Sequence, residues 1–171
     1  MIDLTHFKFC PSCGKPGVKR HLKNALQCDV CGFTYFHNTA SAVAGIVQKQ
    51  GRLMLVKRNH SPRSGYDDLP GGFVEYNEAA ETALRREMRE ELNIELSAIK
   101  YFGSFPNKYR FGGIDYFTCD LIFTCTLVSS ALLRPNDEIA EIKFVRPAEI
   151  DFNRIAFKSI RFALKKYARN V

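Results

Sequence analysis

The sequence contains no tryptophan among its 171 residues, which excludes any motif that requires an indole ring. It has no apolar run long enough to cross a bilayer as a helix, and its first residues, MIDLTHFKFCPSC, lack the basic start and apolar stretch of a secretory signal. Internal repeats and low-complexity segments are also missing. With 46% apolar and 25% charged residues, the composition is that of a globular protein, for which we expect a cytoplasmic location and no membrane partner.

The net positive charge lies at both ends of the chain, and the middle is close to neutral. Residues 1–38 carry five basic and two acidic side chains, residues 39–150 carry 14 and 15, and residues 151–171 carry six and one. The net charge is +7. This distribution is compatible with a polyanionic ligand and equally with plain solubility.

Four of the six cysteines form two tight pairs in the pattern C-x2-C-x14-C-x2-C, and each pair is followed by glycine. In a reducing compartment such pairs bind metal more often than they form disulfides. Four thiolates at this spacing match a closed, structural Zn²⁺ site, and residues 1–38 resemble a zinc ribbon. The alternatives are a chance pattern and a redox pair. The predicted ligands are Cys10, Cys13, Cys28 and Cys31.

Beyond residue 39 the pattern mixes strands with two main helices, which predicts a layered α/β domain. Asn77 is expected to cap a helix that ends near Asn93, with one apolar residue in every four facing the core, and a closing helix is expected over 152–168. The predicted strands are 42–48, 53–57, 99–104, 116–128 and 141–145, and the predicted loops or turns are 59–68, 69–72, 107–113 and 129–137.

Three glutamates, Glu87, Glu90 and Glu91, lie at spacings that place them on one face of the first helix. Clustered like charges destabilise a helix unless something neutralises them, and a hard cation such as Mg²⁺ does so while bridging to diphosphate oxygens. A solvated helix face with ordinary i,i+4 ion pairs is the alternative. The glycines before the helix, Gly71 and Gly72, permit a sharp turn and a close approach of phosphate or metal.

The segment GFVEYNEAAETALRREMREELNI resembles the Nudix box, G-x5-E-x7-R-E-U-x-E-E-x-G-U, in which U is a bulky aliphatic residue. One position departs, because Asn93 stands where the family has glycine, and asparagine is the usual second choice for a left-handed helix end. The positions that match are Gly72, Glu78, Arg86, Glu87, Met88, Glu90, Glu91 and Ile94.

The resemblance implies an α/β/α Nudix sandwich with a mixed sheet and a role for each matching residue. Glu87, Glu90 and Glu91 would hold Mg²⁺ or Mn²⁺. The carbonyl of Gly72 would lie near the metal, Glu75 is a further contributor, and Glu78 would pair with Arg86 to hold the loop against the helix. The general base is left open between a glutamate of the box and Glu138, and a solvated loop carboxylate is an equal interpretation of Glu138.

A zinc ribbon followed by a Nudix domain resembles the NADH pyrophosphatase branch of the family. That branch carries the signature S-Q-P-W-P-F-P-x-S after the box, of which only the Phe-Pro step at residues 105–106 matches here. Phe105 and Tyr109 nevertheless offer faces for base stacking, and Arg110 offers a phosphate contact. A partly buried aromatic loop is the alternative interpretation.

Three functions follow from these features. The first is Mg²⁺-dependent hydrolysis of a diphosphate linkage in a nucleoside diphosphate derivative such as NADH or ADP-ribose. The second is cleansing of nucleoside triphosphates. The third is a nucleic-acid-binding or regulatory protein that reuses the fold, against which the complete set of carboxylates argues. A small-molecule nucleotide is the expected partner, a homodimer is left open, and nucleic-acid binding by the ribbon is left open without being favoured.

Overall fold

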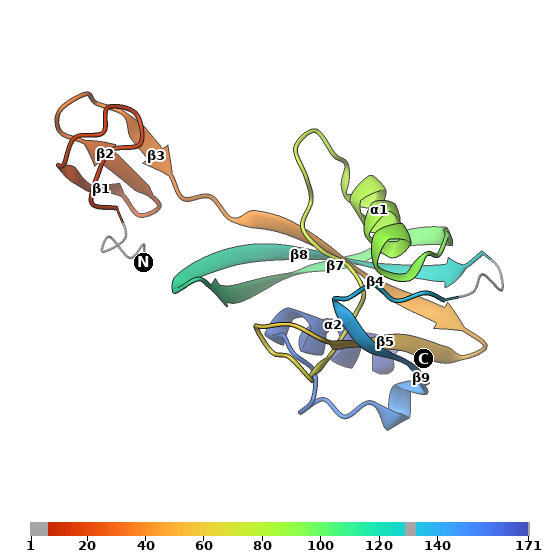
Figure 1. The fold of residues 1–171 in the computed structure, drawn as a ribbon. Coiled ribbons are helices and arrows are strands. Elements are labelled where there is room, and N and C mark those ends of the chain that lie inside the picture. The colour runs from red at the N-terminus through yellow and green to blue at the C-terminus, as the bar shows by residue number, and fades with distance from the viewer. Residues whose placement is uncertain (1–6, 129–132, 171) are drawn as a thin grey trace. The chain divides into compact units, whose positions relative to one another are not determined.

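The computed structural model describes residues 7–128 and 133–170 (Figure 1). The chain divides into two compact units, one formed by Met1–Thr39 with Gly112–Ile114 and the other by Ala40–Phe111 with Asp115–Val171. None of the helices in the described residues is long and apolar enough to cross a membrane. Each unit is considered on its own below.

The N-terminal unit is a three-stranded antiparallel sheet in the order β1-β2-β3, built from Val18–Leu22, Ala25–Cys28 and Thr34–Phe36. The cysteine pairs flank this sheet in two similar turns. Gly14 and Gly32 close these turns at φ 71° and 73°, and each donates its amide to the carbonyl of the first cysteine of its pair. Glycine suits these positions because the left-handed region costs it nothing.

The second unit contains a six-stranded mixed sheet in the order β6-β5-β4-β8-β7, with β9 pairing to β5. Strands β4 and β8 run parallel, from the pair Ala40–Thr118 to the pair Gln48–Thr126, and β5 pairs antiparallel with β4, β6 and β9. The strands are β4 Ala40–Lys49, β5 Arg52–Arg58, β6 Asp67–Asp68, β7 Leu96–Phe111, β8 Ile114–Leu127 and β9 Ile139–Val145.

Helices α1 (Ala80–Leu92) and α2 (Lys158–Ala168) cover opposite faces of this sheet, as Figure 1 shows, and a short 3-10 helix spans Pro147–Glu149. Alternation along the strands produces the two cores, because successive side chains point to opposite faces. The core beneath α1 contains Val43, Val47, Met54, Val56, Leu84, Met88, Leu92 and Phe123. The core beneath α2 contains Ala44, Ile46, Leu53, Leu55, Ile122, Ile160, Ala163 and Leu164. The predicted α/β/α sandwich with a mixed sheet is confirmed.

Both predicted helix starts are wrong. Helix α1 begins at Ala80, its N-cap is Ala79, and Asn77 instead takes a left-handed conformation at φ 59° in the preceding turn. Helix α2 begins at Lys158 because the residues before it pair with β6: the Asp67 amide donates to the Arg154 carbonyl, and the Ala156 amide donates to the Asp67 carbonyl. The predicted C-terminal end of α1 is confirmed, with Asn93 in the left-handed region at φ 56°.

The predicted loop at 107–113 is also wrong, because β7 continues through Phe111 and turns into β8 at Gly112 and Gly113. Both glycines have positive φ, 56° and 82°, as a tight two-residue hairpin turn requires. The paired glycines were the sequence signal for this hairpin. The predicted loop 59–68 ends in the short strand β6. Part of the predicted loop 129–137, residues 129–132, lies outside the described residues.

The segment between β6 and α1 runs antiparallel to β4 and carries the glycines of the box. Gly45 donates its amide to the Pro70 carbonyl at 3.0 Å, and Val43 donates to the Gly72 carbonyl at 2.8 Å. Gly71 lies at φ 144°, and a Cβ added there would meet the Val43 carbonyl oxygen at 2.1 Å. The backbone of this segment therefore approaches β4 more closely than any side chain would allow.

Replacing Gly71 with alanine should destabilise the second unit by about 3 kcal/mol or more, because the new methyl group meets backbone atoms that have no room to move. Gly51→Ala is the matched control, since Gly51 has φ 72° with no neighbour within 4 Å, and it should cost about 1–2 kcal/mol. Chemical denaturation of both variants measures the difference. Equal losses of stability would contradict the close approach at Gly71.

Candidate active site

Arg86, in the second turn of α1, joins the helix to the segment that precedes it. Its Nε and Nη2 atoms donate to the two carboxylate oxygens of Glu78 at 3.1 and 3.0 Å, and Nη2 also donates to the Phe73 carbonyl at 2.9 Å. Its Nη1 atom donates to Glu87 at 2.8 Å and Glu90 at 3.0 Å. These bonds use all five N–H groups of the guanidinium. Glu78 is thereby held against the helix, and its pKa is lowered, chiefly by the hydrogen bond from Arg86.

Glu87 lies against Gly72. A Cβ on that glycine would lie 2.4 Å from the Glu87 Oε1 atom, so any larger residue there would displace this carboxylate. The Gly72 carbonyl oxygen accepts the Val43 amide in the sheet, which leaves its second lone pair for any further contact. Glu75 is exposed, and its amide donates to Glu78.

Glu91 is the most buried of the three glutamates, with 8% of its surface exposed. The Gly71 amide donates to its Oε2 atom at 2.9 Å. Burial raises the pKa of Glu91 to about 8, against the lowering effect of that hydrogen bond, and the charges of Glu87 and Glu138 add to the increase. Burial likewise raises the pKa of Glu87. The two side chains therefore carry negative charge at an electrostatic cost that a nearby cation would relieve.

The cysteine quartet is a group of possible metal ligands whose sulfur atoms all lie within 4.8 Å of one another. Among the described residues, no other three or more acidic, histidine or cysteine side chains meet this limit. Glu87, Glu90 and Glu91 of α1 therefore do not form such a group. Glu87 and Glu90 are both bonded to Arg86, which takes the place of a counterion between them. The charge of Glu138 nevertheless contributes to the raised pKa values of both Glu87 and Glu91.

The cysteine quartet is a candidate metal centre in the N-terminal unit. The Sγ atoms of Cys10 and Cys31 lie 3.7 Å apart, and those of Cys13 and Cys28 lie 3.8 Å apart. Thiolates at the corners of a tetrahedron with Zn–S bonds of about 2.3 Å would be separated by about 3.8 Å. Backbone amides of Cys13 and Ser12 donate to the Cys10 sulfur and lower the pKa of that thiol to about 7. The four sulfurs thus match a tetrahedral ion in both spacing and chemistry.

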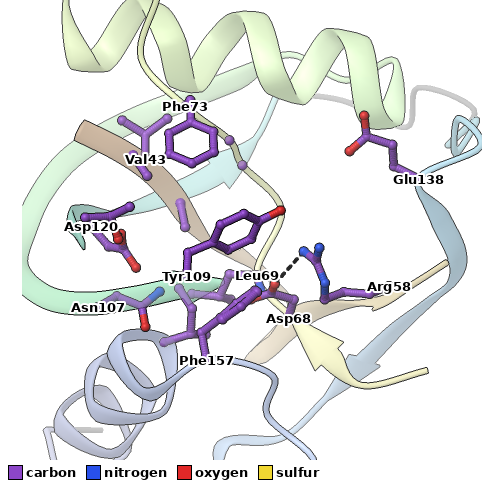
Figure 2. Close-up of a pocket in the computed structure, with 16 residues that line it drawn as sticks. Val43, Arg58, Asp68, Leu69, Phe73, Asn107, Tyr109, Asp120, Glu138 and Phe157 are labelled. Carbon is purple, nitrogen blue, oxygen red and sulfur yellow. Dashed lines mark hydrogen bonds and ion pairs between the residues drawn. The ribbon is translucent and has the colours of Figure 1, made fainter. Parts of the chain in front are cut away.

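A cavity of about 220 Å³ begins at the glycine segment and extends between the sheet and the start of α2 (Figure 2). Gly71, Gly72 and Glu138 form part of its wall. Tyr109 also lines it, with its ring centroid 6.0 Å from that of Phe73 and 5.8 Å from that of Phe157. The cavity therefore connects the surroundings of the α1 carboxylates to a group of aromatic rings.

Polar groups lie among these rings. Asp68 is buried and accepts a hydrogen bond from Arg58 at 3.2 Å, and the Arg58 guanidinium lies 5.0 Å from the centre of the Phe157 ring. Burial raises the pKa of Asp68 to about 6, although the charge of Arg58 opposes this change. The remaining polar side chains of the cavity are Asn107, Thr118 and Asp120.

The structure separates the predicted substrate residues. Tyr109 and Glu138 line the cavity. Phe105 packs instead against the core beneath α2, with the Lys166 ammonium 6.0 Å from its ring centre. Arg110 lies in a neighbouring groove of about 490 Å³ and forms an ion pair with Asp115 at 3.2 Å. Phe105 is therefore displaced from the predicted base-stacking position: alternation puts it on the same face of β7 as Asn107 and Tyr109, but further along the strand, where it packs on the core beneath α2.

Several cavity residues were missed in the sequence, namely Arg58, Asp68, Phe73, Asn107, Asp120 and Phe157. Two signals were available. Asp67 and Asp68 are adjacent acids directly before the Leu-Pro-Gly-Gly turn, and Asp120 interrupts an otherwise apolar and β-branched run. A charged residue in such a strand is buried only when something compensates its charge.

The fold and the glycine–glutamate segment define the class of the protein. The NUDIX domain model matches residues 36–166, and this chain belongs to the Nudix family. A NUDIX hydrolase structure from Nitrosomonas europaea is similar, with a TM-score of 0.77 and 27% identity over 95% of this chain and 91% of that one. A MutT NUDIX hydrolase from Burkholderia pseudomallei, with a TM-score of 0.60 and 22% identity over 75% of this chain and 97% of that one, shares the fold. The predicted membership of the Nudix family is confirmed.

The curated relatives include two proteins with the same description. A NAD-capped RNA hydrolase NudC from Haemophilus influenzae is 32% identical over 121 residues, which cover 65% of this chain and 46% of that protein. Its counterpart from Vibrio vulnificus is 35% identical over 99 residues, which cover 58% of this chain and 38% of that protein. The matches thus span less than half the length of these relatives.

Removing the charge of Glu91 should stabilise the metal-free protein at high pH. A carboxyl whose pKa is higher in the folded chain holds a proton that the unfolded chain has released, so stability falls as the pH rises from about 4.5 to about 8. Glu91→Gln stays neutral and keeps an acceptor for the Gly71 amide.

The measurement is the melting temperature in the presence of a chelator for divalent cations too weak to strip the cysteine quartet. At pH 9 the melting temperature of Glu91→Gln should be higher than that of the wild type, by about 2–4 °C for each kcal/mol of stability gained by removing the charge. The difference in melting temperature should become smaller towards pH 5. Glu81→Gln, an exposed position on the same helix, should follow the wild type. A gap that stays constant with pH would show that the raised pKa of Glu91 is wrong.

Proposed function

We propose that this chain hydrolyses the diphosphate linkage of a nucleoside diphosphate derivative of the NAD type. One observation carries the proposal: a single cavity joins Gly71, Gly72 and Glu138, beside the carboxylates of α1, to the rings of Tyr109, Phe73 and Phe157. Hydrolysis of a diphosphate needs carboxylates that can hold a metal ion, and a planar base can stack on the aromatic rings. The NudC relatives are NAD-capped RNA hydrolases, and the NAD cap contains the same kind of linkage.

We further propose that Glu87, Glu90 and Glu91 hold Mg²⁺ or Mn²⁺, with the Gly72 carbonyl beside it. Carboxylate oxygens are the ligands that these hard cations prefer, and two of the three glutamates have raised pKa values that a cation would lower. Bound there, the cation supplies neutralisation of charge on the diphosphate and acidification of water. Nudix hydrolases generally use a divalent metal of this kind.

The chain's own residues would then perform three tasks. Glu78 and Arg86 fix the glycine segment against α1, so that the ligand carboxylates keep their positions. Tyr109 and Phe157 orient the base. Glu138 is the candidate that accepts the proton of the attacking water, because it lines the cavity from the loop before β9. A glutamate of the box remains the alternative general base.

Substrate turnover tests the proposal directly. In a Mg²⁺-dependent comparison of NADH, NAD⁺, ADP-ribose, NAD-capped RNA and nucleoside triphosphates, we expect the dinucleotide-type substrates to be hydrolysed to mononucleotides. Glu90→Gln should lower kcat by about 100-fold or more, because it removes one charge that offsets the metal. Glu81→Gln on the same helix should leave kcat unchanged.

Each of the other results would contradict the proposal in a different way. A clear preference for triphosphates would support the cleansing function instead. Absence of turnover for every compound, together with RNA binding, would support the regulatory function. Normal kcat in Glu90→Gln would remove Glu90 from the catalytic set.

We also propose that Cys10, Cys13, Cys28 and Cys31 hold one structural Zn²⁺ ion and that residues 1–38 form a ribbon separate from the Nudix domain at 39–171. The spacing of the sulfurs and the amides donated to them support a closed tetrahedral site. Reduced thiolates are consistent with a cytoplasmic location. Homodimer formation stays open, and nucleic-acid binding by the ribbon stays open without being favoured.

Elemental analysis of the purified chain should find one zinc ion per chain. Cys28→Ser should lose it, because three thiolates leave the tetrahedron open. Cys119→Ser, a cysteine outside the quartet, is the matched control and should keep it. Retention of a full zinc equivalent in Cys28→Ser would rule out the four-cysteine site.

A further inference from the structure

Asp120 on β8 lies in the wall of the cavity (Figure 2). Only 6% of its surface is exposed. Thr118 donates its hydroxyl to the Asp120 Oδ1 atom at 2.6 Å, and Ser159 donates its hydroxyl to Oδ2 from the first turn of α2. The carboxylate is therefore fixed in position from two elements.

Comparison with the other buried aspartates of the unit reveals what Asp120 lacks. Asp68 pairs with Arg58 at 3.2 Å, and Asp67 pairs with Lys143 at 2.6 Å. Within residues 7–128 and 133–170, Asp120 forms no ion pair, and its side chain accepts hydrogen bonds from two neutral hydroxyls. A buried carboxylate without a cation is costly unless further donors satisfy it.

The spare hydrogen-bonding capacity of Asp120 is that of an acceptor. A carboxylate accepts at about four lone-pair positions, and the two hydroxyls use two of them. Since the residue lines the cavity, a ligand can supply the missing donor. The aromatic rings of Tyr109, Phe73 and Phe157 line the same cavity and suit a planar ring.

We propose that Asp120 accepts a hydrogen bond from the exocyclic NH₂ group of the base that stacks in this cavity, so that the cavity selects an amino-bearing ring over its deaminated form. This inference rests on the proposed function, because it takes the substrate to be a dinucleotide of the NAD type. Such a substrate offers two NH₂ groups of this kind, the amino group of adenine and the carboxamide of nicotinamide. Deamination replaces either one with oxygen, which would face the carboxylate as a second acceptor.

Two analogues distinguish the two sources in the wild-type enzyme. Nicotinamide hypoxanthine dinucleotide lacks the adenine amino group, and nicotinic acid adenine dinucleotide lacks the carboxamide nitrogen, while both keep the diphosphate. We expect kcat/KM for one of them to fall about 10- to 100-fold below that for NAD⁺, the usual effect of losing one hydrogen bond to a charged group. If both analogues are hydrolysed as well as NAD⁺, the inference is overturned.

Asp120→Asn gives the sharper result, because an asparagine amide can donate to the oxygen of the deaminated ring. The preference for the amino form should disappear or reverse in this variant, which a merely structural role for Asp120 would not produce. Ser159→Ala is the matched control: it removes one donor to Asp120, lies outside the cavity wall and keeps the carboxylate, so the preference should persist. An intact preference in a folded Asp120→Asn protein would overturn the inference, and the wild-type comparison decides the question if that variant does not fold.

A binding measurement separates this inference from the proposed function. If the wild type hydrolyses none of the dinucleotides, the proposed function fails, and calorimetry with the full chain then compares AMP with IMP and nicotinamide mononucleotide with nicotinic acid mononucleotide. Tighter binding of one amino form, lost in Asp120→Asn, supports the role of Asp120. Equal binding within both pairs overturns it.

Discussion

The five hydrogen bonds of the Arg86 guanidinium are the constraint on which the rest of the site depends. They join a helix rich in carboxylates to the glycine segment that precedes it, and they offset the repulsion between Glu78, Glu87 and Glu90. Lysine carries its charge at one point and cannot bond Glu78 with two parallel N–H groups while also contacting a backbone carbonyl. Arg86 thus positions the α1 carboxylates without itself lying in the cavity.

Three of the buried carboxylates of the second unit are each stabilised by a different kind of hydrogen-bond donor. Glu91 receives a backbone amide and has a pKa of about 8, whereas Asp68 has a guanidinium and a pKa of about 6. Asp120 has hydroxyls alone. The site therefore carries a surplus of negative charge at the end where a cation and a diphosphate would bind. Among the rings where a base would stack, Asp120 is the buried carboxylate held by hydroxyls alone.

The sequence predicts the parts of this arrangement that are local in the chain. The Nudix box, the left-handed end at Asn93 and the cysteine quartet depend on spacings within one helix or two turns, so reading residue types at fixed intervals was sufficient. The start of α2 and the wall of the cavity depend on contacts between distant segments. Residues 154–156 look helical in isolation, but they pair with Asp67. Because β7 is extended through both Phe105 and Tyr109, the two rings lie at different points along the strand, and only Tyr109 reaches the cavity.

The central claim is that the carboxylates held by Arg86 form a divalent cation site. Calorimetric titration of Mn²⁺ into the zinc-loaded chain tests it without any substrate. The account predicts binding to the wild type, an affinity at least about tenfold lower in Glu87→Gln, which lies against Gly72, and an unchanged affinity in Glu81→Gln. Equal Mn²⁺ affinity in the wild type and Glu87→Gln would contradict it, because the cation would then bind somewhere other than the carboxylate face of α1.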